Sequence, residues 1–146
     1  MSIFSSINIS SSALTAERTR MDVISKNLAN ANTTRTQSGD PYRRQVVVFK
    51  EAEEKQSFKS ILESKKSKDV DKGVEIVGIV EDKTPFRQVY NPGHPDADEK
   101  GYVTMSNVDT ITEMVDMISA TRSYEASVTA LNTSKSMLLK ALEIGK

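Results

Sequence analysis

The chain has 146 residues, enough for one domain or for one small domain with extended elements. Lys and Arg number 20, as do Asp and Glu, so the formal net charge is zero and no general attraction to nucleic acid is implied. Hydrophobic residues make up 37% of the chain and aromatic residues 5%, which is thin for the core of a compact globule. Cysteine is absent, which excludes disulfides and thiolate chemistry.

The start of the chain lacks the basic region and the long apolar region of a secretory signal peptide. No segment approaches about 18 consecutive apolar residues, so we expect no insertion into a membrane.

The first predicted helix covers residues 1 to about 32. An apolar residue recurs every seven positions, and Ile24 falls three positions after one of them. The recurring residues are Ile7, Leu14, Met21 and Leu28. This partial heptad is typical either of one amphipathic helix on a small core or of half of a two-helix coiled coil.

Three asparagines, Asn27, Asn30 and Asn32, close this helix. Asparagine is poor in a helix interior because its amide competes for backbone groups. Two interpretations stay open. The amides satisfy backbone groups and set the register where the helix meets other subunits, or they form a frayed helix end in solvent.

The middle of the chain, residues 35–106, is predicted to be a small antiparallel β unit, because short runs rich in Val, Ile, Tyr and Phe alternate with Gly- and Pro-containing loops. The runs are "YRRQVVVF", "VEIVGIV", "FRQVY" and "YVTM". Arg43 and Arg44 lie at the start of the first strand. There, two solvated side chains at a strand edge are favoured over a pair that binds phosphate.

Residues 50–72 are dense in charges of both signs and are predicted to be a solvated insertion or a partner-contacting arm. Phe58, Ile61 and Leu62 could form a short helix within it.

Residues 107–146 form the strongest helical segment, with Asn107 or Asp109 as the N-cap and Gly145 as a C-cap candidate. Its apolar stripe shifts near Arg122, which implies more than one packing partner. The stripe comprises Val108, Ile111, Met114, Val115 and Ile118, and then Met117, Tyr124, Val128, Leu131, Leu138 and Leu142. A helix of about 35 residues is about 50 Å long, too long for a small globule to cover.

The sequence gives little indication of an enzyme active site. The single histidine, His94, lies between prolines and is predicted to be a turn residue. There is no Gly-rich phosphate loop, nucleophile elbow or paired-His metal motif, so we expect no catalytic residue, no metal and no cofactor.

The expected fold is therefore α+β. Long terminal helices (1–34 and 107–146) pair as a coiled coil, with a small antiparallel β domain (35–106) between them. Because one helix pair buries only one stripe of each helix, we expect the ends to be marginal alone and ordered by neighbouring copies.

Two motifs are specific. Asn27-Leu28-Ala29-Asn30 resembles the Asn-Leu-Ala-Asn motif of flagellar axial proteins, and "SYEA" leads on to "LEIG" at the end of the chain. With "GHPDAD" and "GYV" before the last helix, the chain resembles the flagellar basal-body rod proteins, and among them the proximal rod proteins.

This resemblance implies a non-enzymatic structural subunit of the rod, the driveshaft between motor and hook. It implies export through the flagellar type III apparatus, without a cleaved signal peptide, and assembly in the periplasm. The implied partners are FlgB, FlgF, FlgG, the base adaptor FliE, the export apparatus and further copies of the chain. The alternative is an export-associated binding module or another rod paralogue.

The expected assembly interface combines the apolar stripes with the three amides. It comprises Ile7, Leu14, Met21, Ile24, Asn27, Leu28, Asn30, Asn32, Met114, Ile118, Tyr124, Val128, Leu131, Leu138 and Leu142.

Overall fold

The structure, a computed structural model, describes residues 3–52 and 72–144. Three expectations lie wholly or mostly outside the described residues. They are the charged insertion at 50–72, the short helix at Phe58, Ile61 and Leu62, and the C-cap at Gly145.

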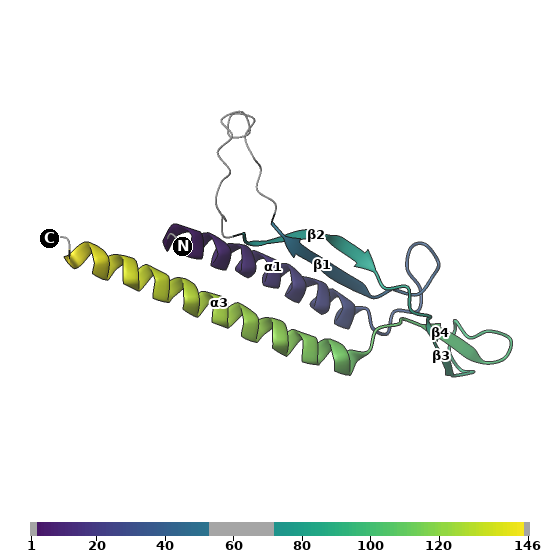
Figure 1. Ribbon diagram of the computed structural model, residues 1–146. Coiled ribbons are helices and arrows are strands. Elements are labelled where there is room, and N and C mark those ends of the chain that lie inside the picture. Colours follow the sequence, from purple (N-terminus) through teal and green to yellow (C-terminus); the bar gives the residue numbers. More distant parts are fainter. Residues whose placement is uncertain (1–2, 53–71, 145–146) are drawn as a thin grey trace, which may run out of the picture.

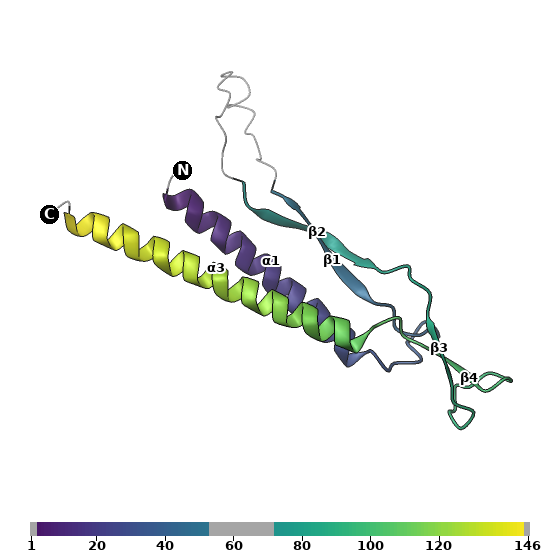
Figure 2. The same cartoon turned by 60° about the horizontal axis from the view of Figure 1, so that its bottom comes forward.

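Two long helices dominate the molecule, α1 (Ile3–Ala29) and α3 (Thr110–Ile144). They lie side by side in both views (Figures 1 and 2). The helices are antiparallel, since Asn27 near the end of α1 hydrogen-bonds Glu113 near the start of α3. The expected α+β class with paired terminal helices is confirmed at this level, and a supercoiled coiled coil stays a prediction.

The two helices differ in length. α1 has 27 residues and α3 has 35, so α3 is longer by about 12 Å at about 1.5 Å per residue. The C-terminal end of α3 extends past the start of α1 (Figures 1 and 2). Among residues 3–52 and 72–144, no other helix therefore lies beside the last turns of α3.

The helix ends follow local hydrogen bonding. α1 ends at Ala29, earlier than predicted, and the Asn30 N–H is shared between the carbonyls of Lys26 and Asn27 as the chain turns. Asp109 caps α3, with Oδ1 accepting from the Ile111 N–H at 3.1 Å. Of the two predicted caps, only Asp109 serves.

Four strands form where the sequence predicts them. They are β1 (Gln45–Glu51), β2 (Val74–Glu81), β3 (Arg87–Tyr90) and β4 (Tyr102–Met105). They make two separate two-stranded antiparallel sheets, β1–β2 and β3–β4, so the expectation of one β unit is only partly right. The register of β1–β2 shifts between Val48 and Phe49, at a bulge.

The first hairpin lies along α1, where the Val74 N–H donates to Ser12 Oγ at 3.0 Å. The second hairpin lies beyond the helix ends (Figure 1). His94 lies in the turn between β3 and β4, as predicted, with Nδ1 accepting from the Asp96 N–H at 3.1 Å.

The buried core is thin, as the composition predicts. Its apolar members are Ala16, Val23, Ile24, Ala31, Tyr42, Val103, Val108 and Ala120. Among the described helices, none is long and apolar enough to cross a membrane.

Candidate functional site

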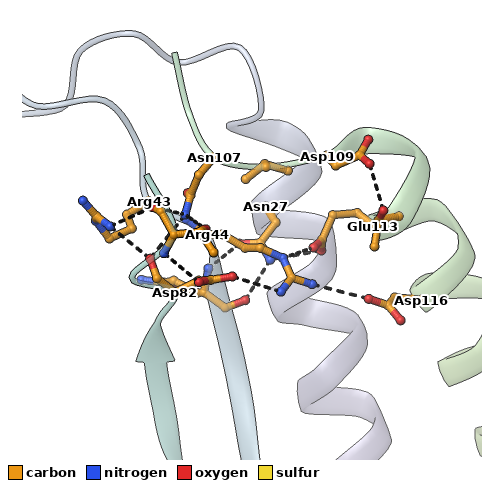
Figure 3. Close-up of polar contacts among 12 residues, drawn as sticks. Asn27, Arg43, Arg44, Asp82, Asn107, Asp109, Glu113 and Asp116 are labelled. Atoms are coloured by element: carbon orange, nitrogen blue, oxygen red, sulfur yellow. Dashed lines mark hydrogen bonds and ion pairs between the residues drawn. The ribbon is translucent and has the colours of Figure 1, made fainter. Parts of the chain in front are cut away.

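The end of α1, the start of β1 and the first turns of α3 meet at a cluster of polar side chains (Figure 3). We refer to it as the polar junction, and its members are Asn27, Tyr42, Arg44, Asp82, Asn107, Glu113 and Asp116. Asn27 and Glu113 are only 1% and 0% exposed. Buried polar groups are costly unless they are paired, so the geometry of this cluster decides whether it stabilises the fold.

Asn27 uses its whole amide within the chain. Its Nδ2 donates to the Gln45 carbonyl at 2.8 Å and to Glu113 Oε2 at 3.0 Å. Its Oδ1 accepts from the Tyr42 hydroxyl at 3.0 Å and from the Gln45 N–H at 2.9 Å. Two donors and two acceptor sites are all that an amide side chain has, so Asn27 is saturated and ties α1, β1 and α3 together.

Arg44 provides the positive charge of the junction. Its Nε donates to Glu113 Oε1 at 2.6 Å, its Nη1 lies 3.5 Å from Asp82 Oδ2, and its Nη2 lies 3.4 Å from Asp116 Oδ2 (Figure 3). Glu113 thus has a charged partner on one oxygen and an amide donor on the other. Such full pairing is what allows a carboxylate to be buried.

The electrostatics of the junction shift two pKa values. Burial alone lowers the pKa of Arg44, but the hydrogen bonds and charges of Glu113 and Asp82 raise it above its usual value overall. Burial, followed by the negative charges of Glu113 and Glu81, raises the pKa of the Tyr42 hydroxyl. Both shifts keep Arg44 charged and Tyr42 neutral, the forms in which they donate hydrogen bonds.

Asn107 closes the junction on the side of the second hairpin. Its Oδ1 accepts from the Arg44 N–H at 2.8 Å, and its Nδ2 donates to Thr84 Oγ1 at 2.8 Å. This explains why Asn107 does not cap α3.

The prediction that Arg43 and Arg44 form a solvated strand edge is wrong. Arg43 lies over the Phe86 ring, 4.3 Å from its centroid, and donates to the Asp82 carbonyl at 3.1 Å. Arg44 is held by three carboxylates, one from Asp82, the residue after β2, and two from Glu113 and Asp116 on α3. The sequence pattern could not show these partners, because they lie 38 to 72 positions away along the chain.

The arrangement of the junction is structural. The Glu113 carboxylate is fully buried and accepts from Arg44 and Asn27, so a substrate has no access to it as a general base. Within residues 3–52 and 72–144, no group of three or more His, Cys, Asp or Glu side chains could hold a metal ion.

Comparison with known proteins agrees with the sequence motifs. Residues 7–36 match the family described as "Flagella basal body rod protein", and residues 99–144 match "Flagellar basal body rod FlgEFG protein C-terminal". A relative in Bacillus subtilis (strain 168), the flagellar basal-body rod protein FlgC, is 53% identical, with 100% of both chains covered. The chain belongs to the FlgC family of flagellar basal-body rod proteins.

Relatives in other organisms give the same result. FlgC of Borreliella burgdorferi is 46% identical over 99% of this chain and 98% of the relative, and FlgC of Escherichia coli O157:H7 is 41% identical over both full chains. These relatives are structural rod proteins. The chain is therefore a structural subunit of the flagellar basal-body rod and not an enzyme.

The rod subunit presents its predicted interface residues in three ways. Some are half-buried or buried along the helix pair, namely Ile7, Leu14, Met21, Ile24, Leu28, Tyr124, Val128, Leu131 and Leu138. Others are exposed, namely Asn32, Met114, Ile118 and Leu142. Asn27 is buried in the polar junction, and Asn30 is half-buried, with its Nδ2 donating to the Lys26 carbonyl at 2.9 Å.

The exposed members on α3 belong to a longer row. We refer to Ile111, Met114, Val115 and Ile118 as the outer stripe; these side chains are 51% to 68% exposed. A helix turns by about 100° per residue, so Ile118 lies about 140° around the helix from buried Glu113. The outer stripe therefore points away from the α1 side.

Sequence reasoning missed Tyr42, Asp82, Glu113 and Asp116, and it gave Arg44 the wrong environment. One signal was present for Glu113. It lies four residues before Met117, in a row that continues to Ala120 and Tyr124 at alternating spacings of three and four residues. A carboxylate in such a row indicates a buried, paired charge.

Proposed function

We propose that this rod subunit assembles through its terminal helices, which pair as a coiled coil and pack against helices of neighbouring subunits in a tubular layer. The strands then face outward from that layer. The observation that carries this proposal is the outer stripe, where four large apolar side chains in a row are exposed on a helix of a rod protein. Apolar rows of this kind mark protein interaction sites.

The spacing of residues along α3 supports a coiled coil with α1. The row on the α1 side alternates by four and three residues, and none of its members is exposed. It comprises Glu113, Met117, Ala120, Tyr124, Ser127, Leu131, Ser134 and Leu138. This is the heptad spacing of a coiled-coil seam, although its small and polar members make it a weak one. A weak seam fits a helix pair that gains stability from neighbours.

In this proposal Asn27 does not contact neighbours. It orients the β-strands on the helix pair, and Asn30 and Asn32 remain the amides available where α1 ends. The neighbours are FlgB, FlgF, FlgG and FliE together with copies of this chain. Export proceeds through the flagellar type III apparatus without a cleaved signal peptide, assembly takes place in the periplasm, and the rod transmits torque from motor to hook.

The test replaces Ile118→Ser in cells that lack the native gene. Because Ile118 is exposed, the purified variant should keep its helix content and stay within about 0.5 kcal/mol of the native free energy of unfolding. We expect the variant to be absent from isolated basal bodies and the cells to be non-motile.

The matched control is Ala126→Ser, which introduces the same residue at an exposed position of α3 outside the outer stripe. It should leave motility unchanged. Normal motility and normal basal bodies with Ile118→Ser would contradict the proposal.

A further inference from the structure

The second hairpin, β3 with β4, has little packing against the rest of the subunit. Among the described helices and strands, β3 and β4 pack only on each other. The hairpin lies beyond the helix ends in both views (Figures 1 and 2). Of its strand residues only Val103 is buried. A unit with so few buried apolar side chains belongs to the low end of local stability and can move as one body.

The two linkers of this hairpin meet at Asn107. Residues 82–86 lead from β2 into β3, and residues 106–109 lead from β4 into α3. Asn107 Nδ2 donates to the carbonyls of Asp82 and Thr84, both at 3.2 Å, and to Thr84 Oγ1 at 2.8 Å. Asn107 Oδ1 accepts from the N–H of Arg44, the residue before β1, at 2.8 Å (Figure 3). One side chain therefore ties both linkers to the start of the first hairpin.

Arg43 donates to the same two carbonyls. Its Nη1 lies 3.1 Å from the Asp82 carbonyl oxygen and 3.3 Å from the Thr84 carbonyl oxygen. Its guanidinium also lies over the ring of Phe86, the last residue of the first linker. Each carbonyl thus accepts from two side chains that come from different segments of the chain. We refer to Asn107 and Arg43 together as the clamp.

We infer that the second hairpin pivots where its two linkers cross, and that the clamp holds it in one orientation relative to the helix pair. This orientation belongs to the free subunit and does not depend on how the subunit assembles. The linkers contain no glycine and Pro85 fixes one φ angle, so loss of the clamp allows a tilt rather than free rotation. The hairpin itself stays paired during the tilt, because its strand register and the contact between the Tyr90 and Tyr102 rings lie within it.

A weaker contact reaches the turn of the hairpin from the segment after α1. Thr34 Oγ1 donates to Asp96 Oδ2 at 2.9 Å, and Arg35 Nη1 lies 4.0 Å from Asp96 Oδ1. The hydrogen bond is exposed and the Arg35 side chain is mostly exposed, so water competes for these groups and the contact contributes little. Both residues of the clamp are half-buried. The clamp therefore sets the orientation and the Thr34 contact does not.

Distances between spin labels test the clamp on the purified full chain, which has no cysteine of its own. One label pair joins Lys100→Cys, in the turn of the second hairpin, to Glu125→Cys on α3, and both positions are exposed. A reference pair joins Val77→Cys, an exposed position on β2, to the same position on α3. Labelled chain is diluted into unlabelled chain, so that only distances within one copy are measured.

The clamp is removed by Asn107→Asp together with Arg43→Leu. Aspartate keeps the acceptor for the Arg44 N–H but lacks the amide donors, and leucine keeps an apolar contact with the Phe86 ring. The native background should give one narrow distance distribution for each label pair, and circular dichroism should show the same helix content with and without the clamp.

Without the clamp, the distribution for the Lys100 pair should broaden by several Å. Lys100 lies roughly 20 Å from the crossing of the linkers, at about 3.3 Å per strand residue, so a modest tilt moves it far. The Val77 pair should stay narrow, because Asn27 and Ser12 still hold the first hairpin on α1.

Thr34→Val removes the weaker contact, and as the matched control it should leave both distributions unchanged. A Lys100 distribution that stays narrow without the clamp, or that is already broad in the native background, would overturn the inference. Broadening of both label pairs would also overturn it, since the clamp would then support the whole fold. Broadening of the Lys100 pair by Thr34→Val would show that the Thr34 contact sets the orientation instead.

Discussion

The Asn27 side-chain amide at the end of α1 donates a 3.0 Å hydrogen bond to the Glu113 carboxylate on α3, 86 positions later in the chain. Both side chains are buried, and Arg44 supplies the charge that makes the burial of Glu113 tolerable. The orientation of the β-strands on the helix pair therefore depends on a few polar contacts rather than on a large apolar core.

Glu113→Gln should destabilise the isolated subunit. The glutamine keeps the size of the side chain, but it removes the charge opposite Arg44 and places an N–H₂ donor near either Arg44 or the Asn27 amide. Breaking a buried pair in this way costs about 2 to 4 kcal/mol of the free energy of unfolding. Urea unfolding followed by circular dichroism measures it. Glu125→Gln, at an exposed position of the same helix, is the control and should change little; equal stability of the two variants would contradict the role of the junction.

Asn27→Asp should be destabilising in a pH-dependent manner. It removes both amide donors and sets a second carboxylate beside Glu113, and two such close charges cannot both ionise cheaply. One pKa of the pair is then raised, so the deficit relative to the native chain should be about 2 to 4 kcal/mol at pH 7 and should shrink as the pH falls. Asn32→Asp, at an exposed position, should show neither effect. A pH-independent deficit in Asn27→Asp would argue against the carboxylate pair.

The N-cap of α3 should contribute to acid sensitivity. Hydrogen bonds from the Thr112 hydroxyl and the Ile111 N–H lower the pKa of Asp109. Because the folded-state pKa is below the unfolded one, ionised Asp109 stabilises the fold above about pH 4, and this stabilisation is lost as the pH falls through the lowered value. Asp109→Asn can still cap the helix but does not titrate. Its melting temperature should therefore fall less steeply below about pH 4 than that of the native chain, and parallel curves would contradict this.

Asn30→Leu separates folding from assembly. The substitution removes the hydrogen bond to the Lys26 carbonyl near the end of α1, a loss of about 1 kcal/mol, so the purified subunit should remain folded. We expect the variant to be missing from isolated basal bodies and the cells to be non-motile. Normal motility would show that the Asn30 amide has no part in assembly.

Local patterns were sufficient for much of the fold. Apolar spacing and the Asp109 cap predicted α3, and runs of β-branched residues between glycines and prolines predicted all four strands. The division of the strands into two sheets could not be predicted, because strand pairing depends on contacts between distant segments.

The amides and arginines show where the sequence was insufficient. By itself it determined the two helices, the strand-forming runs and the rod family, since these follow from side-chain spacing and motifs along the chain. Only the tertiary structure decided that Asn27 and Arg44 are internal while Met114 and Ile118 are exposed. The burial of a polar or apolar side chain depends on which distant element covers it. For Asn27 and Arg44 that element is α3, whereas no element of the described chain covers Met114 and Ile118.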